Sequence, residues 1–281
     1  AYMSFLAGGD SRNDKCVANC IVGDRCPEIV LVDKEVAAHP DIATALGVTP
    51  PSNPPLCKNI GWTMPYHATH LAGIMIGQDT GTSFAGLAPH SKFSSFDYDK
   101  KVGAPGAGTS ALVNLIRSKN QFANARSIIF VFASKFTNVQ DIEPALSDPR
   151  LRRERPAFIP ELLNSDNLWV VAAGQGKAKG RYIDGTTPDS PMNLGDTPNV
   201  LVVTACEDCL TDDIKVSSWA NYSDALVNLA APGGTPVDGI PAPATATEYS
   251  TTHGTSQAAA MVGGLAAAMV GCYPDVYRSG R

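Results

Sequence analysis

The sequence predicts an α/β protein with a doubly wound, mostly parallel central sheet and helices on both faces of that sheet. Two features of the chain predict this fold. Short runs rich in β-branched residues recur along it, and each run is apolar throughout, as in strands that are covered on both faces. Helical stretches lie between several of these runs, and such alternation of strands and helices favours a parallel sheet.

The first expected strand is the run EIVLVD, residues 28–33, which closes on an aspartate. Four later runs have the same apolar character. In a parallel sheet the carboxyl ends of the strands meet at one edge, and reactive groups gather there. The later runs are SIIFVFAS (127–134), LWVVAAG (168–174), NVLVVTA (199–205) and DALVNLAAPG (224–233).

Two stretches between these strands are expected to be helical. The first is HATHLAGIMIG, residues 67–77. The second is TSALVNLIRSKNQFANA, residues 109–125, for which Thr109 or Ser110 is the expected N-cap. Both helices would cover a face of the sheet.

A third expected helix begins at Ser256, near the end of the chain. Only Gln257 is polar between Ser256 and Gly271, so we expect this helix to be apolar on all sides and buried in the core. A serine in the first turn lies beside free backbone N–H groups and the positive end of the helix dipole, which stabilise an oxyanion. The alternative interpretation is a simple N-cap serine.

The composition is that of a soluble globular domain. The chain has 281 residues, of which 44% are hydrophobic and 17% charged, so general disorder is excluded. The net charge of −5 gives no reason to expect nucleic acid or an anionic membrane as a partner. The longest apolar run, residues 258–270, is too short to span a bilayer and contains two glycines. No signal peptide is expected, because the first residues lack a basic region and a long apolar region.

The cysteines favour disulfides in an oxidising compartment, so we expect a secreted or otherwise extracytoplasmic protein. Four of the seven lie within the first 57 residues, and the odd total leaves at least one unpaired. The alternative is zinc, because Cys206 and Cys209 have the two-residue gap of a zinc half-site, but a second such pair is missing. The others are Cys16, Cys20, Cys26, Cys57 and Cys272.

A nucleophilic serine needs a base, and His67 and His70 in YHATHLAG are the candidates. A zinc peptidase would have H-E-x-x-H, whereas these histidines are three residues apart with no glutamate, so no metal ligands are expected. One histidine would be the base and the other a hydrogen-bonded helix residue. A base is oriented by a carboxylate, and Asp33 closes the first strand at the edge where one is useful. A turn or helix cap is the alternative role for Asp33.

The order Asp33, His67, Ser256 is that of subtilisin, and the residues around each agree with it. Five stretches resemble, in order, motifs of the subtilisin-like serine peptidases. The resemblance runs from about residue 28 to 270 and implies the subtilisin-like fold. VLVDKEVAAHPDI resembles the strand–Asp–turn–HPD segment, HATHLAGIMIG the HGTHVAG helix, FAGLAPHSK the GVAP turn, SSWANYSDALVNLAAPG the stretch that ends in APG, and HGTSQAAAMVGG the GTSMASPHVAG motif.

The resemblance implies a serine endopeptidase that acts through an acyl-enzyme. Ser256 would attack a peptide carbonyl, His67 would take its proton and later give it to the leaving amine, and Asp33 would hold the imidazole tautomer. Activity should rise as His67 loses its proton. The implied partners are a polypeptide substrate and an inhibitory propeptide. No cofactor is required, and a structural calcium is compatible with the family.

Around this triad the chain departs from the family's pattern. The family's oxyanion donor is an asparagine in an AAGN turn, whereas VVAAGQGKAKG has Gln175, which keeps the amide but adds a methylene. The backbone N–H of Ser256 is the second expected donor. The departures from the family's pattern at Gln175 and Phe132 are expected to affect the rate and specificity of cleavage. By resemblance, Phe132, Ala133 and Ser134 stand where a strand pairs with the substrate backbone, and Ala172, Ala173 and Gly174 line one wall of the pocket for the residue before the cut.

The whole chain, residues 1–281, is expected to form a single peptidase domain, with residues 1–27 as a cysteine-containing extension packed on it. Only 25 residues follow Ser256, so the family's C-terminal helices are expected to be missing or replaced. Two other functions fit the same motifs. One is a catalytically impaired binding or scaffold domain, and the other is an acyl transferase that joins peptides.

Overall fold

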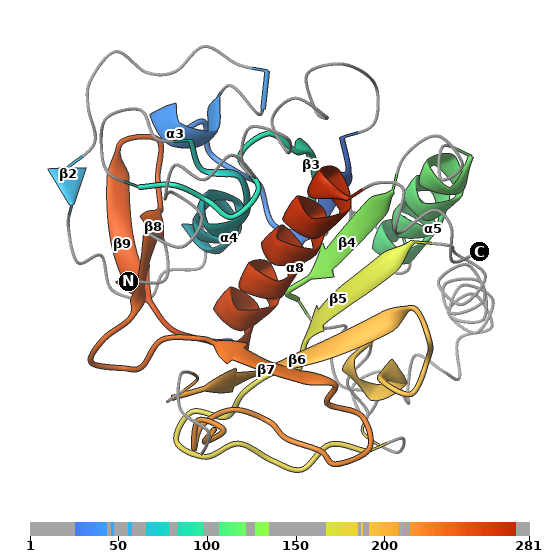
Figure 1. Ribbon diagram of the computed structural model, residues 1–281, viewed down its shortest axis with the longest axis vertical. Helices are drawn as coiled ribbons and strands as arrows, with labels where there is room; N and C mark the ends of the chain where they lie inside the picture. Colours follow the sequence, from blue (N-terminus) through green and yellow to red (C-terminus); the bar gives the residue numbers. More distant parts are fainter. Residues whose placement is uncertain are drawn as a thin grey trace.

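A six-stranded parallel sheet forms the centre of the protein, with the strand order β3-β1-β4-β5-β6-β7 (Figure 1). The strands are β1 (Glu28–Asp33), β3 (Lys92–Asp97), β4 (Ile128–Phe132), β5 (Leu168–Ala172), β6 (Val200–Cys206) and β7 (Leu229–Pro232). The computed structural model describes residues 26–43, 46–47, 56–57, 66–78, 84–97, 107–121, 127–134, 167–184, 187, 191–207, 209 and 214–273.

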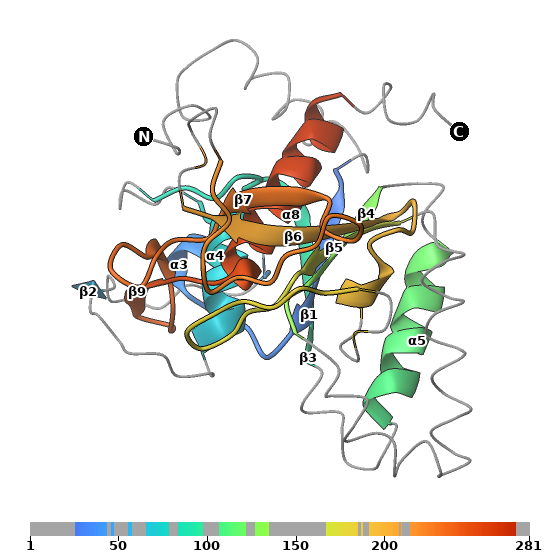
Figure 2. The same ribbon diagram turned by 90° about the horizontal axis from the view of Figure 1, so that it is seen from below.

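Helices cover both faces of this sheet, as the sequence predicts (Figure 2). On one face, α4 (His67–Ile76) and α8 (Thr255–Cys272) pack on a core that includes Ile29 and Leu31. On the other, α5 (Ala107–Asn120) packs on a core that includes Val30 and Val32. Because successive side chains of a strand point to opposite faces, a strand covered on both sides is apolar throughout.

Helix α8 lies across the sheet and contacts β1, β4, β5, β6 and β7 as well as α4. Glycines allow this close approach, since a Cβ on Gly263 would lie 2.4 Å from Val131 Cγ2. The expectation that α8 is buried on all sides is wrong, because Leu265 and Met269 are 46% and 45% exposed. By length and composition α8 could cross a membrane, but half of it is buried in the protein, as in the core helix of a globular domain.

A small second sheet leads the chain into α8. Its order is β2-β9-β8, with β2 (Leu56–Cys57), β8 (Ile240–Pro243) and β9 (Glu248–Thr252), and β8 pairs with β9 in antiparallel fashion. Strand β8 packs on α4, and β9 ends three residues before α8 begins. The hairpin therefore brings the first turn of α8 to the first turn of α4, where Gln257 faces His70. The remaining short helices are α3 (Pro40–Ala43) and the 3-10 turn η2 (Met192–Leu194).

Several expected boundaries differ from the observed ones. Helix α5 begins at Ala107, so Thr109 and Ser110 lie within its first turn and neither is its N-cap. Strand β7 begins at Leu229, and a turn over residues 224–226 precedes it.

The cysteines of the described region are consistent with disulfides. Cys206 and Cys209 form a disulfide at the end of β6, so this pair is not a zinc half-site. Cys272 is also disulfide-bonded, and Cys26 is buried. The predicted extension over residues 1–27 lies outside the described residues, apart from Cys26 and Pro27.

Candidate active site

The strand order reverses at β1, because the chain passes from β1 to β3 on one side and then to β4 on the other. In open parallel sheets, ligands bind at the carboxyl ends of the strands on either side of such a reversal. Asp33 ends β1, Ala133 and Ser134 follow β4, and Gln175 follows β5. The predicted catalytic and oxyanion residues therefore gather at the place where this topology puts a site.

Asp33 is paired with His67. The Nδ1–H of His67 donates to Asp33 Oδ2 over 2.9 Å, and the side chains are 10% and 1% exposed, respectively. A carboxylate can only accept, so the proton of a neutral imidazole lies on Nδ1 and the lone pair on Nε2. The Lys34 backbone N–H donates to Asp33 Oδ1 over 2.7 Å and fixes the carboxylate.

Ser256 is the second residue of α8, and its hydroxyl donates to the Ala133 carbonyl over 3.3 Å. The residue after Ala133, Ser134, donates its hydroxyl to Asp33 Oδ2 over 3.4 Å. Asp33 and Ser256 are therefore both tied to the same dipeptide, which places Ser256 Oγ within about 13 Å of the carboxylate. The three residues converge on the carboxyl end of β4.

Gln175 lies against the first turn of α8, and its Oε1 accepts the Thr255 backbone N–H over 2.9 Å. Because a backbone N–H can only donate, the contacting atom is the amide oxygen, and Nε2 remains a donor. A Cβ on Gly254 would lie 2.9 Å from Oε1 and 3.4 Å from Nε2. The extra methylene of glutamine is thus used to seat the amide on the turn that carries Ser256.

The turn before Gln175 is held from two sides. Gly174 has φ +82°, a conformation that favours glycine, and its N–H donates to Thr255 Oγ1 over 3.1 Å. Asn221 donates its side-chain amide to the Ala173 carbonyl over 2.8 Å, and its backbone N–H donates to the Gly174 carbonyl over 3.0 Å. Sequence reasoning missed Thr255 and Asn221, because their partners are 80 or 48 residues away and no local pattern indicates them.

Two predicted cleft residues do not present their side chains to a cleft. Phe132 and Ala173 are 1% and 0% exposed and belong to the core on the α5 face of the sheet. This corrects the expectation that the Phe132 side chain alters the cleft, because the side chain lies in the core and β4 is paired with β1 and β5 on its two sides. Ala172 is buried in the core on the α8 face, and Gly174 is partly exposed.

His70, the second histidine of α4, is a structural residue. Its Nε2–H donates to the Ile240 carbonyl over 2.9 Å, and its Nδ1 faces the Gln257 side-chain amide nitrogen at 3.5 Å. Burial lowers the pKa of His70 from 6.5 to about 4, so the ring is neutral at physiological pH. His70 thus joins α4 to β8 and to α8, and its two nitrogens are already engaged.

Within the described ranges there is no group of three or more His, Cys, Asp or Glu residues that could hold a metal ion. Calcium also binds backbone and amide oxygens, so the structural calcium stays a prediction.

The family model described as the subtilase family matches residues 29–279. The chain belongs to the subtilase family. A search of curated proteins gives no match.

Solved structures of other proteins share the fold of this subtilase. Sphericase has a TM-score of 0.61 at 21% identity, with 92% of this chain and 82% of that chain covered. A psychrophilic protease, S41, has a TM-score of 0.59 at 19% identity, with the same coverage. The prenylagaramide maturation protease PagA has a TM-score of 0.56 at 19% identity, with 95% of this chain and 82% of that chain covered. At these identities the likeness establishes the fold.

Proposed function

We propose that this subtilase is a serine endopeptidase that hydrolyses polypeptides through an acyl-enzyme formed on Ser256. The observation that carries the proposal is the 2.9 Å hydrogen bond between His67 Nδ1 and Asp33 Oδ2, at the edge of the sheet where Ser256 stands in the first turn of α8. A buried carboxylate that orients an imidazole is the arrangement that a nucleophilic serine requires.

The proposed reaction follows from the proton positions at this site. The Ser256 hydroxyl turns from the Ala133 carbonyl toward His67 Nε2, which takes its proton as the oxygen attacks the substrate carbonyl. Asp33 stabilises the imidazolium, and His67 then protonates the leaving amine. Water repeats the sequence on the acyl-enzyme, with His67 again as base, and releases Ser256.

Two donors would stabilise the negative oxygen of the tetrahedral intermediate. One is the Ser256 backbone N–H, which belongs to the first turn of α8, where N–H groups lack partners within the helix. The other is Gln175 Nε2, whose amide is fixed by the bond from Thr255 to its oxygen. Preorganised donors of this kind need no rearrangement as charge develops.

The disulfides at Cys206–Cys209 and Cys272 support an extracytoplasmic location, since structural disulfides persist in oxidising compartments. We infer a polypeptide substrate and an inhibitory propeptide as partners, and neither nucleic acid nor a membrane. We infer further that no cofactor is required for catalysis. A structural calcium would be detected as a lower melting temperature in the presence of a chelator.

The test is cleavage of a denatured protein and of a peptide library, with the products identified by mass spectrometry. The parent chain should give new peptide ends, and Ser256→Ala should give none. A parent chain that binds the substrates without cleaving them would support a binding domain. Joined peptides in the presence of an added amine nucleophile would support acyl transfer.

A further inference from the structure

One asparagine, Asn221, joins the two ends of the loop that carries the proposed oxyanion donor. This loop covers residues 174–180, includes Gln175 and returns to Arg181, and we name it the oxyanion loop. At its first end, Asn221 Nδ2 donates to the Ala173 carbonyl over 2.8 Å, and at its second end Asn221 Oδ1 accepts the Arg181 N–H over 3.1 Å. A single side-chain amide therefore connects two points of the chain that are eight residues apart.

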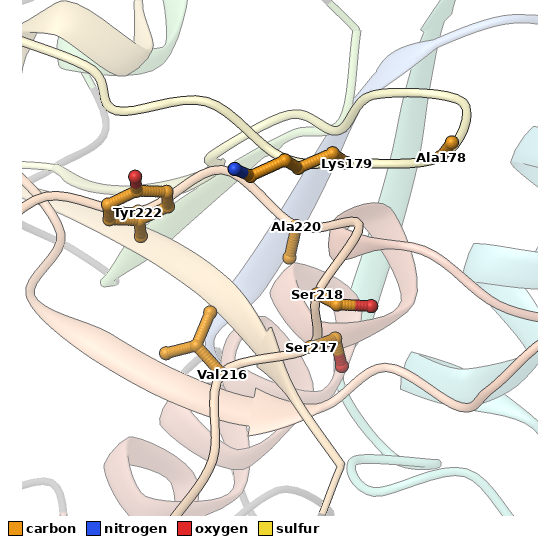
Figure 3. Close-up of a pocket in the computed structure, with 7 residues that line it drawn as sticks. All are labelled: Ala178, Lys179, Val216, Ser217, Ser218, Ala220 and Tyr222. Atoms are coloured by element: carbon orange, nitrogen blue, oxygen red, sulfur yellow. The ribbon is translucent and has the colours of Figure 1, made fainter.

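The backbone around Asn221 also pairs with the oxyanion loop. The Asn221 N–H donates to the Gly174 carbonyl over 3.0 Å, and the next residue of the loop, Gln175, forms an antiparallel bridge with Ala220. Farther along the loop, Lys179 lines one pocket together with Ala220 (Figure 3). Since successive side chains of a paired segment point to opposite faces, this pairing sets the direction of the Gln175 side chain.

Asn221 is tied to the central sheet as well. Its backbone carbonyl accepts the Thr204 hydroxyl of β6 over 2.6 Å, and the residue is 3% exposed. Strand β6 pairs with β5, from which the oxyanion loop leaves. Hydrogen bonds that are shielded from water hold a geometry more strongly than exposed ones. The asparagine therefore fixes the oxyanion loop to the central sheet.

The two ends of the oxyanion loop require a side chain that both donates and accepts. The Ala173 carbonyl can only accept and the Arg181 N–H can only donate, so the amide orientation of Asn221 follows from its partners. A carboxylate of the same shape would satisfy only the N–H, and the methyl group of alanine would satisfy neither. Because a buried backbone group without a partner is costly, the loop would shift to find other partners.

We propose that Asn221 is a positioning residue that holds the oxyanion loop so that Gln175 Nε2 meets the negative oxygen of the intermediate. This inference rests on the proposed function, in which that atom is an oxyanion donor. Thr255 fixes the end of the Gln175 side chain, and Asn221 fixes the backbone from which the side chain starts. Because Asn221 is buried and bonded at both ends of its amide, it acts through Gln175 and touches no substrate.

The test is a double-mutant cycle on peptide hydrolysis with Asn221→Ala and Gln175→Ala. In the parent, Asn221→Ala should lower kcat between about 10-fold and 100-fold, because misplacement of a catalytic group by about 1 Å costs up to about 100-fold. KM should change less than about threefold, since an oxyanion donor acts in the transition state. In the Gln175→Ala background the donor is already absent, so the same substitution should lower kcat less than about threefold.

Two outcomes of this cycle would overturn the proposal. One is a kcat for Asn221→Ala within about threefold of the parent. The other is an equal fall of kcat in the two backgrounds, because a merely structural role of Asn221 would not depend on the Gln175 side chain.

Asn228 offers a matched control, because its side chain makes the same two kinds of bond elsewhere. Its Nδ2 donates to the Gly195 carbonyl over 2.9 Å, and its Oδ1 accepts the Val202 N–H over 2.7 Å. Asn228 stands directly before β7, at the amino end of that strand, whereas the candidate active site lies at the carboxyl ends. Asn228→Ala should leave kcat within about threefold of the parent. A fall equal to that of Asn221→Ala would show a general loss of stability and overturn the proposal.

Hydrogen exchange tests the same role without any cleavage, so it stays decisive if the chain cuts no peptide. Exchange of the backbone amides in residues 174–181 is followed by mass spectrometry, and Asn221→Ala should speed it about tenfold while Asn228→Ala leaves it unchanged. Equal exchange in the parent and Asn221→Ala would overturn the proposal. If Asn221→Ala does not fold, Asn221→Asp replaces it in both measurements, because it keeps the acceptor for Arg181 and loses only the donor to Ala173. Its added charge acts in both backgrounds of the cycle and therefore cancels.

Discussion

Substitution of Gln175 tests two roles of one side chain. Its Oε1 accepts the Thr255 N–H at the start of α8, and its Nε2 is the proposed oxyanion donor. Gln175→Glu keeps an oxygen acceptor for Thr255 but removes the amide donor. Gln175→Ala removes both. The pair therefore separates the stability of the helix from the chemistry of the site.

The expected magnitudes follow from these contacts. Loss of a side-chain cap at a helix start costs about 0.5–2 kcal/mol, so Gln175→Ala should lower the free energy of unfolding by about 1 kcal/mol. A carboxylate near a helix N-terminus stabilises by about 0.3–1 kcal/mol, so Gln175→Glu should be as stable as the parent or more so. Removal of one oxyanion donor costs about 10²–10³ in kcat, a magnitude measured on subtilisin itself.

The assays are urea unfolding and peptide hydrolysis for the parent and both variants. We expect kcat to fall at least about 100-fold in each variant, with stability lost in Gln175→Ala alone. The added charge in Gln175→Glu also repels the developing oxyanion. A kcat for Gln175→Glu within about threefold of the parent would refute the assignment of Nε2 as a donor. Equal stability of Gln175→Ala and the parent would refute the role of Gln175 as a cap of α8.

Three further predictions concern Asp33, His70 and Gly254. Asp33→Asn should lower kcat about 10⁴-fold in the peptide assay, because the imidazole loses the acceptor that fixes its tautomer, and a loss under tenfold would contradict this. Since the pKa of His70 is about 4 in the folded chain and 6.5 in the unfolded one, protons bind the unfolded state first as pH falls. The free energy of unfolding should therefore decline between pH 6.5 and pH 4, by about 3 kcal/mol from this group. Urea unfolding of His70→Asn should show a smaller decline of the free energy of unfolding over this pH range, and a decline equal to that of the parent would count against the prediction. A Cβ on Gly254 would lie 2.7 Å from Gln257 Oε1 and 2.9 Å from Gln175 Oε1, so Gly254→Ala should displace both amides and lower kcat toward the value of Gln175→Ala, whereas parental kcat would show that the amides adapt.

The fold could be predicted largely because its strands are covered on both faces. EIVLVD is apolar from end to end, so no register or partner has to be known to recognise β1. Strands β8 and β9 carry no such signal. Strand β8 has the sequence IPAP and lies at a sheet edge, where proline removes no ladder bond that the sheet needs. The exposed side of α8 is also invisible in the sequence, because its apolar residues lie on every side.

The sequence predicts those residues of the candidate site that stand at the end of a strand or the start of a helix and whose side-chain type suits the chemistry. Asp33, His67 and Ser256 each stand at such a boundary. The orientation of Phe132 depends instead on the alternation of β4, in which Val131 faces α8 and Phe132 faces α5. The capping role of Gln175 depends on a contact across 80 residues, which no local pattern contains.

The central claim is that Ser256 is activated by His67 and Asp33. It is tested most directly by treating the native chain with a fluorophosphonate and locating the adduct by peptide mapping. The account predicts one adduct, on Ser256, formed much more slowly in His67→Ala and absent from Ser256→Ala. Labelling at another residue, or equal labelling of the parent and Ser256→Ala, would contradict it.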